Sequence, residues 1–232
     1  MRALCIIPAR GGSKRIPRKN VRLLGGRPLL AWPLSQARDA GVFAEVIVST
    51  DDEEIAAIAR TEGATVPFLR SAEASDDRAS TTAVIEEVLA RCGAIQADPF
   101  DLVCCLYPTA ALVRAAHLRR GYELLAGDPA LDSCLSVQAY RHPVERALRI
   151  RDGRVTAVDP TALACRTQDL ERSYHDAGQF YWCRPAALKA NGRLLGRACA
   201  PVLLAAWEAV DLDTEEDWQL LERLVAGKVL GA

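Results

Sequence analysis

The 232-residue sequence contains no apolar run that approaches the roughly 20 residues of a membrane-spanning helix. Its first apolar stretch ends at Pro8, which is too short for a signal peptide. Acidic and basic residues nearly balance, and the net charge of −1 argues against a protein that coats nucleic acid or an anionic membrane. We therefore expect a cytoplasmic protein with neither a membrane nor a nucleic acid as partner.

Paired-cysteine motifs are also missing. None of the eight cysteines forms a Cys-x-x-Cys motif, and no spacing of cysteine and histidine predicts a zinc site. Cys104 and Cys105 lie inside an apolar run. In a chain of this size this pattern favours buried, reduced thiols over a disulfide framework.

Acidic residues are absent from the first sixth of the chain. Asp39 is the first acid, and nine basic residues precede it. These basic residues are Arg2, Arg10, Lys14, Arg15, Arg18, Lys19, Arg22, Arg27 and Arg38. Only four lysines occur in the whole chain, and two of them, Lys14 and Lys19, fall here. A basic segment in a nearly neutral protein predicts a local anion site.

Short apolar runs alternate with amphipathic stretches as far as residue 137. Strands are predicted over 3–8, 45–50, 65–69, 101–107, 131–137, 179–183 and 201–205. Helices are predicted over 28–40, 52–62, 81–91, 114–125 and 214–225. This alternation predicts an α/β fold with a doubly wound, mostly parallel sheet. An Asp-Gly turn at 152–153 predicts a hairpin, inside an irregular excursion at about 138–185 of a single domain spanning 1–232.

A loop rich in glycine and basic residues follows the first predicted strand. In such sheets ligands bind beyond the carboxyl ends of the strands. Gly11 and Gly12 let backbone N–H groups approach an oxyanion, while Arg10, Lys14 and Lys19 supply positive charge. The loop matches neither the GxxxxGK[ST] nor the GxGxxG phosphate motif. The alternative is a solvated basic loop without function.

Residues 9–14 (ARGGSK), 16–17 (IP) and 19–20 (KN) resemble the signature loop of the CMP-sialic acid synthetase family. These cytidylyltransferases activate eight- and nine-carbon keto-acid sugars on a Rossmann-like, nucleotide-diphospho-sugar transferase fold. The resemblance implies that the loop binds the triphosphate of CTP. The implied nucleotide-binding residues are Arg10, Gly11, Gly12, Ser13, Lys14, Lys19 and Asn20.

The resemblance extends along nearly the whole chain. Ser80 and Tyr107 fall where the family contacts the nucleotide, and sialic acid enzymes carry glutamine in place of Tyr107. The alternatives are a helix cap at Ser80 and a core or rim tyrosine at 107. Asp51 and Asp52 follow the second strand, where they either cap a helix or contact substrate.

Asp211 and Asp213 resemble the metal motif of the family. In an extended segment they point to the same side, so they suit Mg²⁺, which prefers carboxylate, phosphate and water oxygens. Asp213 also fits a helix cap, beside a capping box of Thr214 and Asp217. Asp211 lies too far from that helix for capping. The implied catalytic residues are Arg10, Lys19 and Asp211.

The irregular excursion carries the implied sugar site. Residues 175–179 read HDAGQ where sialic acid enzymes show Arg-Pro-Asn-Gly, and this is similar to the pseudaminic acid branch. The implied sugar-binding residues are Arg166, Gln168, His175, Asp176 and Gln179. A structural histidine and a surface arginine are the alternatives at 175 and 166. Legionaminic acid, N-acetylneuraminic acid and an eight-carbon ulosonate are the alternative sugars.

The implied reaction transfers CMP from CTP to the C2 hydroxyl of pseudaminic acid and releases pyrophosphate. The resemblance also implies a homodimer, joined through residues at about 140–180. A sugar-1-phosphate nucleotidyltransferase would need a longer glycine-rich start. A regulator that binds CTP without turnover would not need both Asp211 and Asp213.

Overall fold

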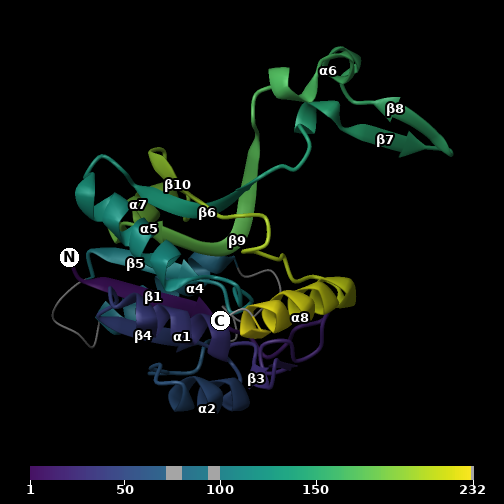
Figure 1. The fold of residues 1–232 in the computed structure, drawn as a ribbon. Coiled ribbons are helices and arrows are strands. Elements are labelled where there is room, and N and C mark those ends of the chain that lie inside the picture. The colour runs from purple at the N-terminus through teal and green to yellow at the C-terminus, as the bar shows by residue number, and fades with distance from the viewer. Residues whose placement is uncertain (72–79, 94–99, 231–232) are drawn as a thin grey trace.

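The computed structural model describes residues 1–71, 80–93 and 100–230, and its centre is a six-stranded sheet of order β10-β6-β9-β5-β1-β4. The strands are β1 (Ala3–Pro8), β4 (Glu45–Ser49), β5 (Leu102–Leu106), β6 (Ser133–Ala139), β9 (Tyr174–Cys183) and β10 (Cys199–Leu203). Strand β9 is antiparallel to both β5 and β6, and the other pairs are parallel. The predicted fold class, a mostly parallel doubly wound sheet, is confirmed (Figure 1).

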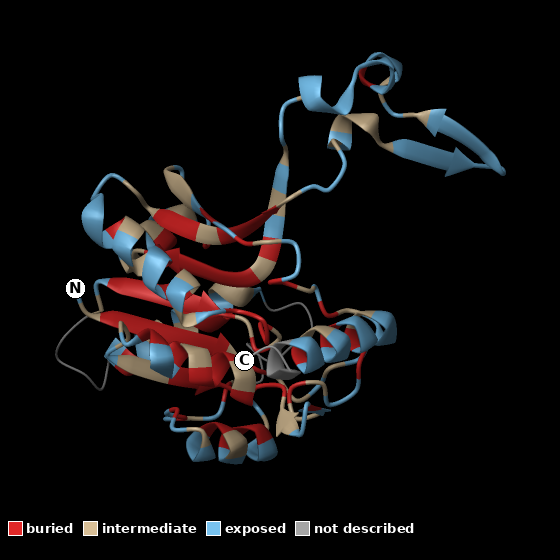
Figure 2. Cartoon of the chain, viewed as in Figure 1, coloured by how far each residue is buried: buried red, intermediate tan, exposed pale blue. Residues whose placement is uncertain are grey.

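Both faces of the sheet are buried. In β1 the side chains of Ala3, Cys5 and Ile7 join one core cluster, and those of Leu4 and Ile6 join another (Figure 2). Because successive side chains of a strand point to opposite faces, a strand between two helix layers is apolar throughout. Helices α1 (Ala31–Ala40), α2 (Glu53–Thr61) and α5 (Ala115–Gly127) cover the first face. Helices α4 (Thr81–Gly93) and α7 (Pro185–Asn191) cover the second.

The last helix packs against the N-terminal loop. Helix α8 (Glu215–Leu230) lies beside the two-residue strands β2 (Leu23–Leu24) and β3 (Arg27–Pro28), as Figure 1 shows. A third core cluster holds Ile16 from the loop and Trp218 from α8. The guanidinium of Arg22 stacks over the Trp218 ring at 4.1 Å and forms two hydrogen bonds with Glu215, of 2.6 and 2.7 Å. The N-terminal loop and the C-terminal helix α8 therefore pack together into one layer. No described helix has the length and apolar character needed to cross a membrane.

Residues 140–173, which we call the arm, stand away from the sheet (Figure 1). The arm contains β7 (Leu148–Arg151), β8 (Arg154–Ala157), α6 (Pro160–Ala164) and the 3-10 turns Val144–Arg146 and Thr167–Asp169. Asp152 and Gly153 have φ angles of 50° and 71°, the positive values that a two-residue hairpin turn requires, so the predicted hairpin is confirmed. Apolar side chains of the hairpin face solvent, and Ile150 is 75% exposed (Figure 2).

Three predicted elements differ from the structure. The strand predicted at 65–69 is wrong: only Thr65 makes a bridge, to Ile47, and Pro67 has no N–H to continue the ladder. The first helix begins at Ala31 instead of residue 28, since Pro28 pairs in β3. Strand β9 begins five residues before the predicted strand. Its first residues include polar side chains, so the apolar pattern of a buried strand does not extend to them.

The eight cysteines are free, and six of them are buried in the sheet and its helices. Burial raises the pKa of the Cys134 and Cys183 thiols to about 12. These side chains therefore stay protonated at neutral pH and pack as small apolar groups. The prediction of reduced, buried thiols holds for these six, while Cys165 is exposed and Cys199 is half-buried.

Gly121 in α5 allows the helix to approach β9. A Cβ at this position would lie 2.5 Å from Nε1 of the buried Trp182, so Gly121→Ala should force a shift of the helix. We expect the free energy of unfolding to fall by about 1–3 kcal/mol in urea titrations. Gly127→Ala, at the open end of the same helix, is the control. Equal stability of the two variants would contradict the close packing.

Candidate active site

A pocket of about 370 Å³ opens at the carboxyl ends of β1 and β5. Strand β1 ends at Pro8, and Ala9 N–H donates to the Ser49 carbonyl of β4 at 2.9 Å before the loop turns away. The pocket is lined by Pro8, Arg10, Ser13, Lys14, Arg15, Lys19, Asn20, Arg70, Thr81, Val84, Tyr107, Pro108 and Thr109. It therefore lies at the sheet edge where open α/β sheets bind ligands.

Most of the predicted nucleotide-binding residues meet in this pocket. Arg10, Ser13, Lys14, Lys19, Asn20 and Tyr107 all line it. Gly11 and Gly12 lie in the same loop but do not line the pocket. Ser80 does not line it either, and its Oγ accepts a hydrogen bond from Ala83 N–H at 3.1 Å. The cap predicted as an alternative for Ser80 is thus present at the start of α4.

Asn20 joins the two ends of the loop. Its side-chain amide donates to the carbonyl of Arg10 at 3.0 Å, and the residue is only 4% exposed. Its Oδ1 is buried and has no hydrogen-bond partner within the described residues. A buried acceptor without a donor costs about 1–3 kcal/mol. A ligand with an N–H or O–H group in the pocket could remove this cost.

Lys19 connects the loop to the predicted metal segment. Its Nζ donates to the carbonyl of Leu212 at 2.8 Å, between Asp211 and Asp213. Burial lowers the pKa of Lys19, and the charge of Asp213 partly opposes this effect. Arg15 forms an ion pair with Asp213. The carboxylates of this segment therefore lie close to the basic loop.

The segment of Asp211 and Asp213 suits a hard cation. Desolvation and the neighbouring charge of Asp213 raise the pKa of Asp211, so a positive ion near both would relieve the repulsion. The predicted capping box is confirmed: Thr214 Oγ accepts from Asp217 N–H at 3.2 Å, and Asp217 accepts from Thr214 N–H at 2.7 Å. The Asp213 carboxylate is not used for this cap. The described residues contain no group of three or more acidic, histidine or cysteine side chains placed to hold a metal, so this segment offers two carboxylates only.

The predicted sugar residues fall into two groups, the first of which lies in β9. Asp176 accepts hydrogen bonds from Gly178 N–H, at 2.8 Å, and from the Tyr181 hydroxyl. Burial and this contact raise the pKa of Tyr181, whose ring centre lies 5.5 Å from that of Tyr107 in the pocket wall. The buried Gln179 side chain is occupied, because its amide donates to the Ala177 carbonyl at 2.9 Å.

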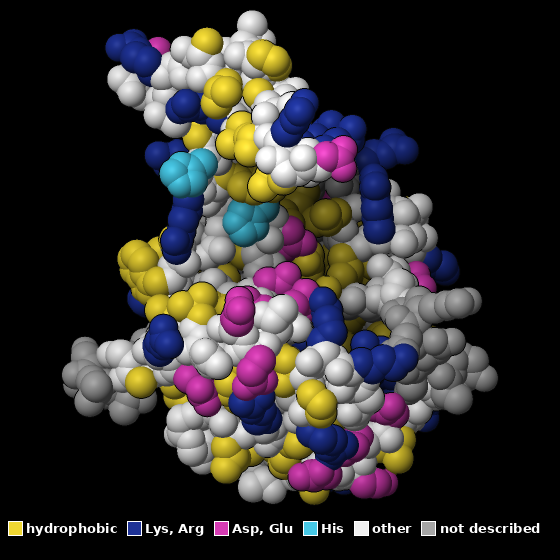
Figure 3. Space-filling model, turned by 90° about the vertical axis from the view of Figure 1, so that its right-hand side faces the viewer, with side chains coloured by type: hydrophobic (Ala, Val, Ile, Leu, Met, Phe, Trp, Pro, Cys, Tyr) yellow, Lys and Arg dark blue, Asp and Glu magenta, His cyan; other side chains and the backbone are white. Residues whose placement is uncertain are grey.

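The second group lies in the arm, and His175 links the two groups, since it belongs to the first residues of β9. The His175 ring lies 4.9 Å from that of Tyr140, at the base of the arm. Arg166 forms two hydrogen bonds with Asp169, of 2.8 and 3.0 Å, and Gln168 lines a separate hollow of the arm. Figure 3 shows the face below the arm, where the surface is hollowed and histidine, acidic and hydrophobic side chains gather. The described chain thus does not bring Arg166 and Gln168 to the pocket of Arg10.

A family model described as "Cytidylyltransferase" matches residues 4–181. This span includes the loop, the pocket and β9 as far as Tyr181. The chain belongs to the cytidylyltransferase family.

Curated relatives match this cytidylyltransferase over nearly its whole length. It is 36% identical over 225 residues to the pseudaminic acid cytidylyltransferase of Campylobacter jejuni subsp. jejuni serotype O:2, covering 97% of this chain and 96% of the relative. It is 32% identical to the CMP-N,N'-diacetyllegionaminic acid synthase of Legionella pneumophila subsp. pneumophila, covering 97% of each.

A solved structure supports the fold assignment. The structure of CMP:2-keto-3-deoxy-manno-octonic acid synthetase complexed with CTP has a TM-score of 0.73 to this chain and covers 98% of it, and all of that chain is covered. At 19% identity this likeness concerns the fold alone.

Sequence reasoning missed Arg70 as a pocket residue. Arg70 is 8% exposed, its Nε donates to Ser49 Oγ at 3.1 Å, and its Nη2 donates to the Ser49 carbonyl. Burial lowers the pKa of this guanidinium, and the negative charges of Asp51 and Glu87 oppose the effect. Arg70 directly follows the strand predicted over 65–69, and nothing in the local pattern marked it as a pocket residue.

Arg70→Lys keeps the positive charge but loses the planar fork that holds Ser49. We expect the free energy of unfolding to fall by about 1–3 kcal/mol. We also expect CTP affinity to fall about tenfold, because the charge would no longer be fixed at the pocket wall. Calorimetric titration with CTP tests this, with the exposed Arg38→Lys as control. Unchanged CTP affinity would leave Arg70 a structural role only.

Proposed function

We propose that this cytidylyltransferase transfers CMP from CTP to the C2 hydroxyl of pseudaminic acid. The observation that carries the proposal is the basic pocket, whose wall residue Tyr107 contacts β9. Tyr107 lines that pocket beside the loop and packs on Tyr181, which holds Asp176. The similarity to a pseudaminic acid cytidylyltransferase at 36% identity supports the choice of sugar.

In this proposal the loop binds the triphosphate. Arg10, Lys14 and Lys19 supply positive charge around the pocket. Gly12 allows close approach of an oxyanion to the backbone, while Gly11 N–H donates to Asp51 and fixes the loop. Ser13, Asn20 and Tyr107 complete the nucleotide side, while Ser80 caps α4 outside the pocket. The unpartnered Oδ1 of Asn20 supports a ligand with a donor group at this place.

Asp211 and Asp213 are the residues that would hold Mg²⁺. When bound, the ion would neutralise charge on the phosphate oxygens during the transfer. Lys19 Nζ donates to the carbonyl between the two carboxylates, so a hydrogen bond joins the loop to the proposed metal segment. Arg15 competes with the ion for Asp213, which favours Asp211 as the main ligand.

The transfer itself needs positioning and charge neutralisation more than covalent catalysis. The C2 oxygen forms a bond to the α-phosphorus, the bond from that phosphorus to the bridging oxygen breaks, and pyrophosphate leaves. The proton of the hydroxyl is released to water. Arg10 and Lys19 stabilise the charge that develops on the phosphates.

For the sugar, Asp176 is the best-placed acceptor, because Tyr181 and Gly178 fix its orientation. His175 adds a second polar group, while Gln179 acts through its backbone: its carbonyl accepts from Tyr107 N–H at 2.9 Å. Arg166 and Gln168 lie in the arm and would reach a sugar only at another site or in another copy of the chain. A cytoplasmic homodimer that covers the exposed apolar side chains of the arm is part of the proposal.

The alternative is the same reaction on another keto-acid sugar. The relative from Legionella pneumophila subsp. pneumophila, named for a legionaminic acid product, favours this alternative at 32% identity. The N-acylneuraminate cytidylyltransferase A of Danio rerio is 34% identical, and its matched part is 50% of its length.

A substrate panel tests the choice of sugar. We expect purified protein with CTP and Mg²⁺ to release pyrophosphate with pseudaminic acid at a kcat/KM at least about tenfold above other sugars, the discrimination that one or two lost contacts give. Legionaminic acid, N-acetylneuraminic acid and an eight-carbon ulosonate complete the panel. Turnover of one of these sugars without turnover of pseudaminic acid would contradict the proposal.

Asp211→Asn tests the proposed metal site. The variant keeps the size of the side chain but removes its charge, so we expect kcat to fall by roughly a hundredfold and the required Mg²⁺ concentration to rise. Initial rates at increasing Mg²⁺ give both quantities. Glu216→Gln, exposed on α8, is the matched control. A wild-type dependence on Mg²⁺ in Asp211→Asn would rule out this residue as a ligand.

A further inference from the structure

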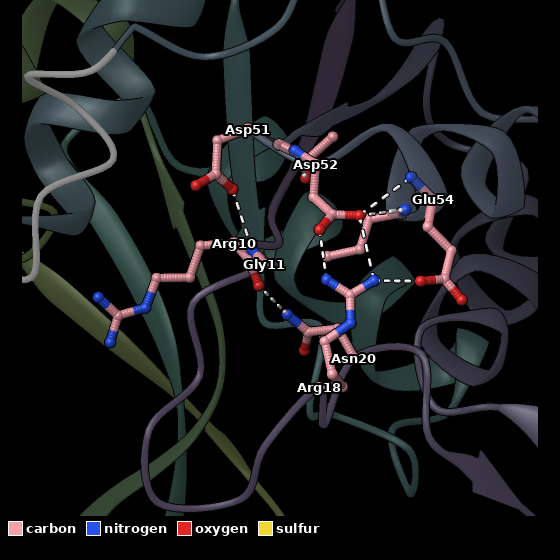
Figure 4. Close-up of polar contacts among 9 residues, drawn as sticks. Arg10, Gly11, Arg18, Asn20, Asp51, Asp52 and Glu54 are labelled. Carbon is pink, nitrogen blue, oxygen red and sulfur yellow. Dashed lines mark hydrogen bonds and ion pairs between the residues drawn. The ribbon is translucent and has the colours of Figure 1, made fainter.

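The acidic turn after β4 contacts the glycine-rich loop through residues that do not line the pocket. Gly11 N–H donates to Asp51 Oδ1 at 2.9 Å (Figure 4). Asp52 is the N-cap of α2, where its Oδ1 accepts from Glu54 and Ile55 N–H, each at 3.0 Å. Neither aspartate lines the pocket. They therefore touch the loop without touching the place of the proposed nucleotide.

Arg18, at the far end of the loop, returns to the same turn. Its guanidinium forms ion pairs with Asp52 and Glu54, and Figure 4 shows it directed away from Arg10. The backbone of Arg18 has a φ of 57°, an unfavourable conformation for a residue with a side chain. Because the ion pairs hold Arg18 there, its charge is kept outside the pocket.

Gly11 is the point where the loop and the turn approach most closely. A Cβ at Gly11 would lie 2.5 Å from Asp52 Oδ2 and 3.0 Å from Asp52 Cβ. The approach thus requires glycine. Gly11 is fixed to Asp51 by a hydrogen bond, and Arg18 is fixed to Asp52 by an ion pair. Ser13, Lys14 and Arg15, which line the pocket, lie between these two fixed points.

We propose that Asp51, Asp52 and Arg18 form a latch that sets the loop in the conformation that receives the triphosphate. They are positioning residues for the transfer and make no contact with substrate. The inference rests on the proposed nucleotide site. A loop that is ordered before binding does not lose conformational entropy when CTP binds, so the latch should act on CTP and not on the sugar.

The contrasting explanation is that Asp52 only caps α2 and that the Arg18 pair is a surface ion pair of small effect. Asp52→Asn separates the two, because asparagine caps helices as well as aspartate but has no charge for Arg18. Asp51→Asn keeps an acceptor for Gly11 N–H, whereas Asp51→Leu removes it. Glu53→Gln is the matched control, since Glu53 pairs with Arg60 on the outer face of α2.

The experiment measures KM for CTP, KM for the sugar, kcat and the thermal midpoint of the full-length variants. For Asp52→Asn and Asp51→Leu we expect kcat/KM for CTP to fall by about 10- to 100-fold, with sugar KM and midpoint unchanged. Asp51→Asn should stay near wild type. Arg18→Met should add little in a background of Asp52→Asn with Glu54→Gln, because those changes already remove both ion pairs of Arg18.

A second measurement needs no nucleotide. Trypsin should cut after Lys14 or Arg15 faster in Asp52→Asn than in Glu53→Gln, since the loop between its fixed points would open more often. Equal cutting, or equal kcat/KM for CTP in these two variants, would overturn the latch. Wild-type protein that neither binds nor turns over CTP would contradict the proposed function, and with it the role of the latch.

Discussion

Repulsion among cations in one short segment is the constraint on which the rest of the structure depends. Seven basic residues lie between 10 and 27, with no acidic residue among them. The fold offsets this repulsion with carboxylates from distant parts of the chain. The pairs join Arg15 to Asp213, Arg18 to Asp52 and Glu54, Arg22 to Glu215, and Arg27 to Glu62. Arg10, Lys14, Arg15 and Lys19 line the pocket, whereas Arg18, Arg22 and Arg27 do not line it and their ion pairs fix the loop and the chain that follows it.

The same ion pairs connect the C-terminal helix α8 to the loop that lines the pocket. Helix α8 packs on the loop through Trp218, and its capping box orders the segment just before it. Asp211 and Asp213 are placed by that segment, while Lys19 holds the carbonyl between them. A change that loosens α8 should therefore disturb the loop and the metal segment together, although α8 contributes no residue to the pocket.

The sequence predicted the parts of this protein that depend on local pattern. The strands that are buried on both faces could be predicted because their residues are apolar throughout. The predicted nucleotide-binding residues of the loop lie together at the pocket because they come from one short segment. Arg70 was missed because its position depends on the Ser49 carbonyl, a contact between distant residues. The start of β9 was missed because His175 and Asp176 interrupt the apolar pattern at the place where the sugar is proposed to bind.

The predicted sugar-binding residues lie in two separate places, in β9 and in the arm, and this separation bears on how the sugar is recognised. A carboxylate such as Asp176 accepts hydrogen bonds only, so it can read hydroxyl or amide groups but repels the carboxylate of an acid sugar. That group needs a cation. Arg166 in the arm is held by Asp169, and the cations at the pocket are proposed to bind phosphate. Recognition of the whole sugar therefore requires either that one loop cation serves both groups or that an arm reaches the pocket. The exposed apolar hairpin favours the second arrangement, because a second copy of the chain would bury it.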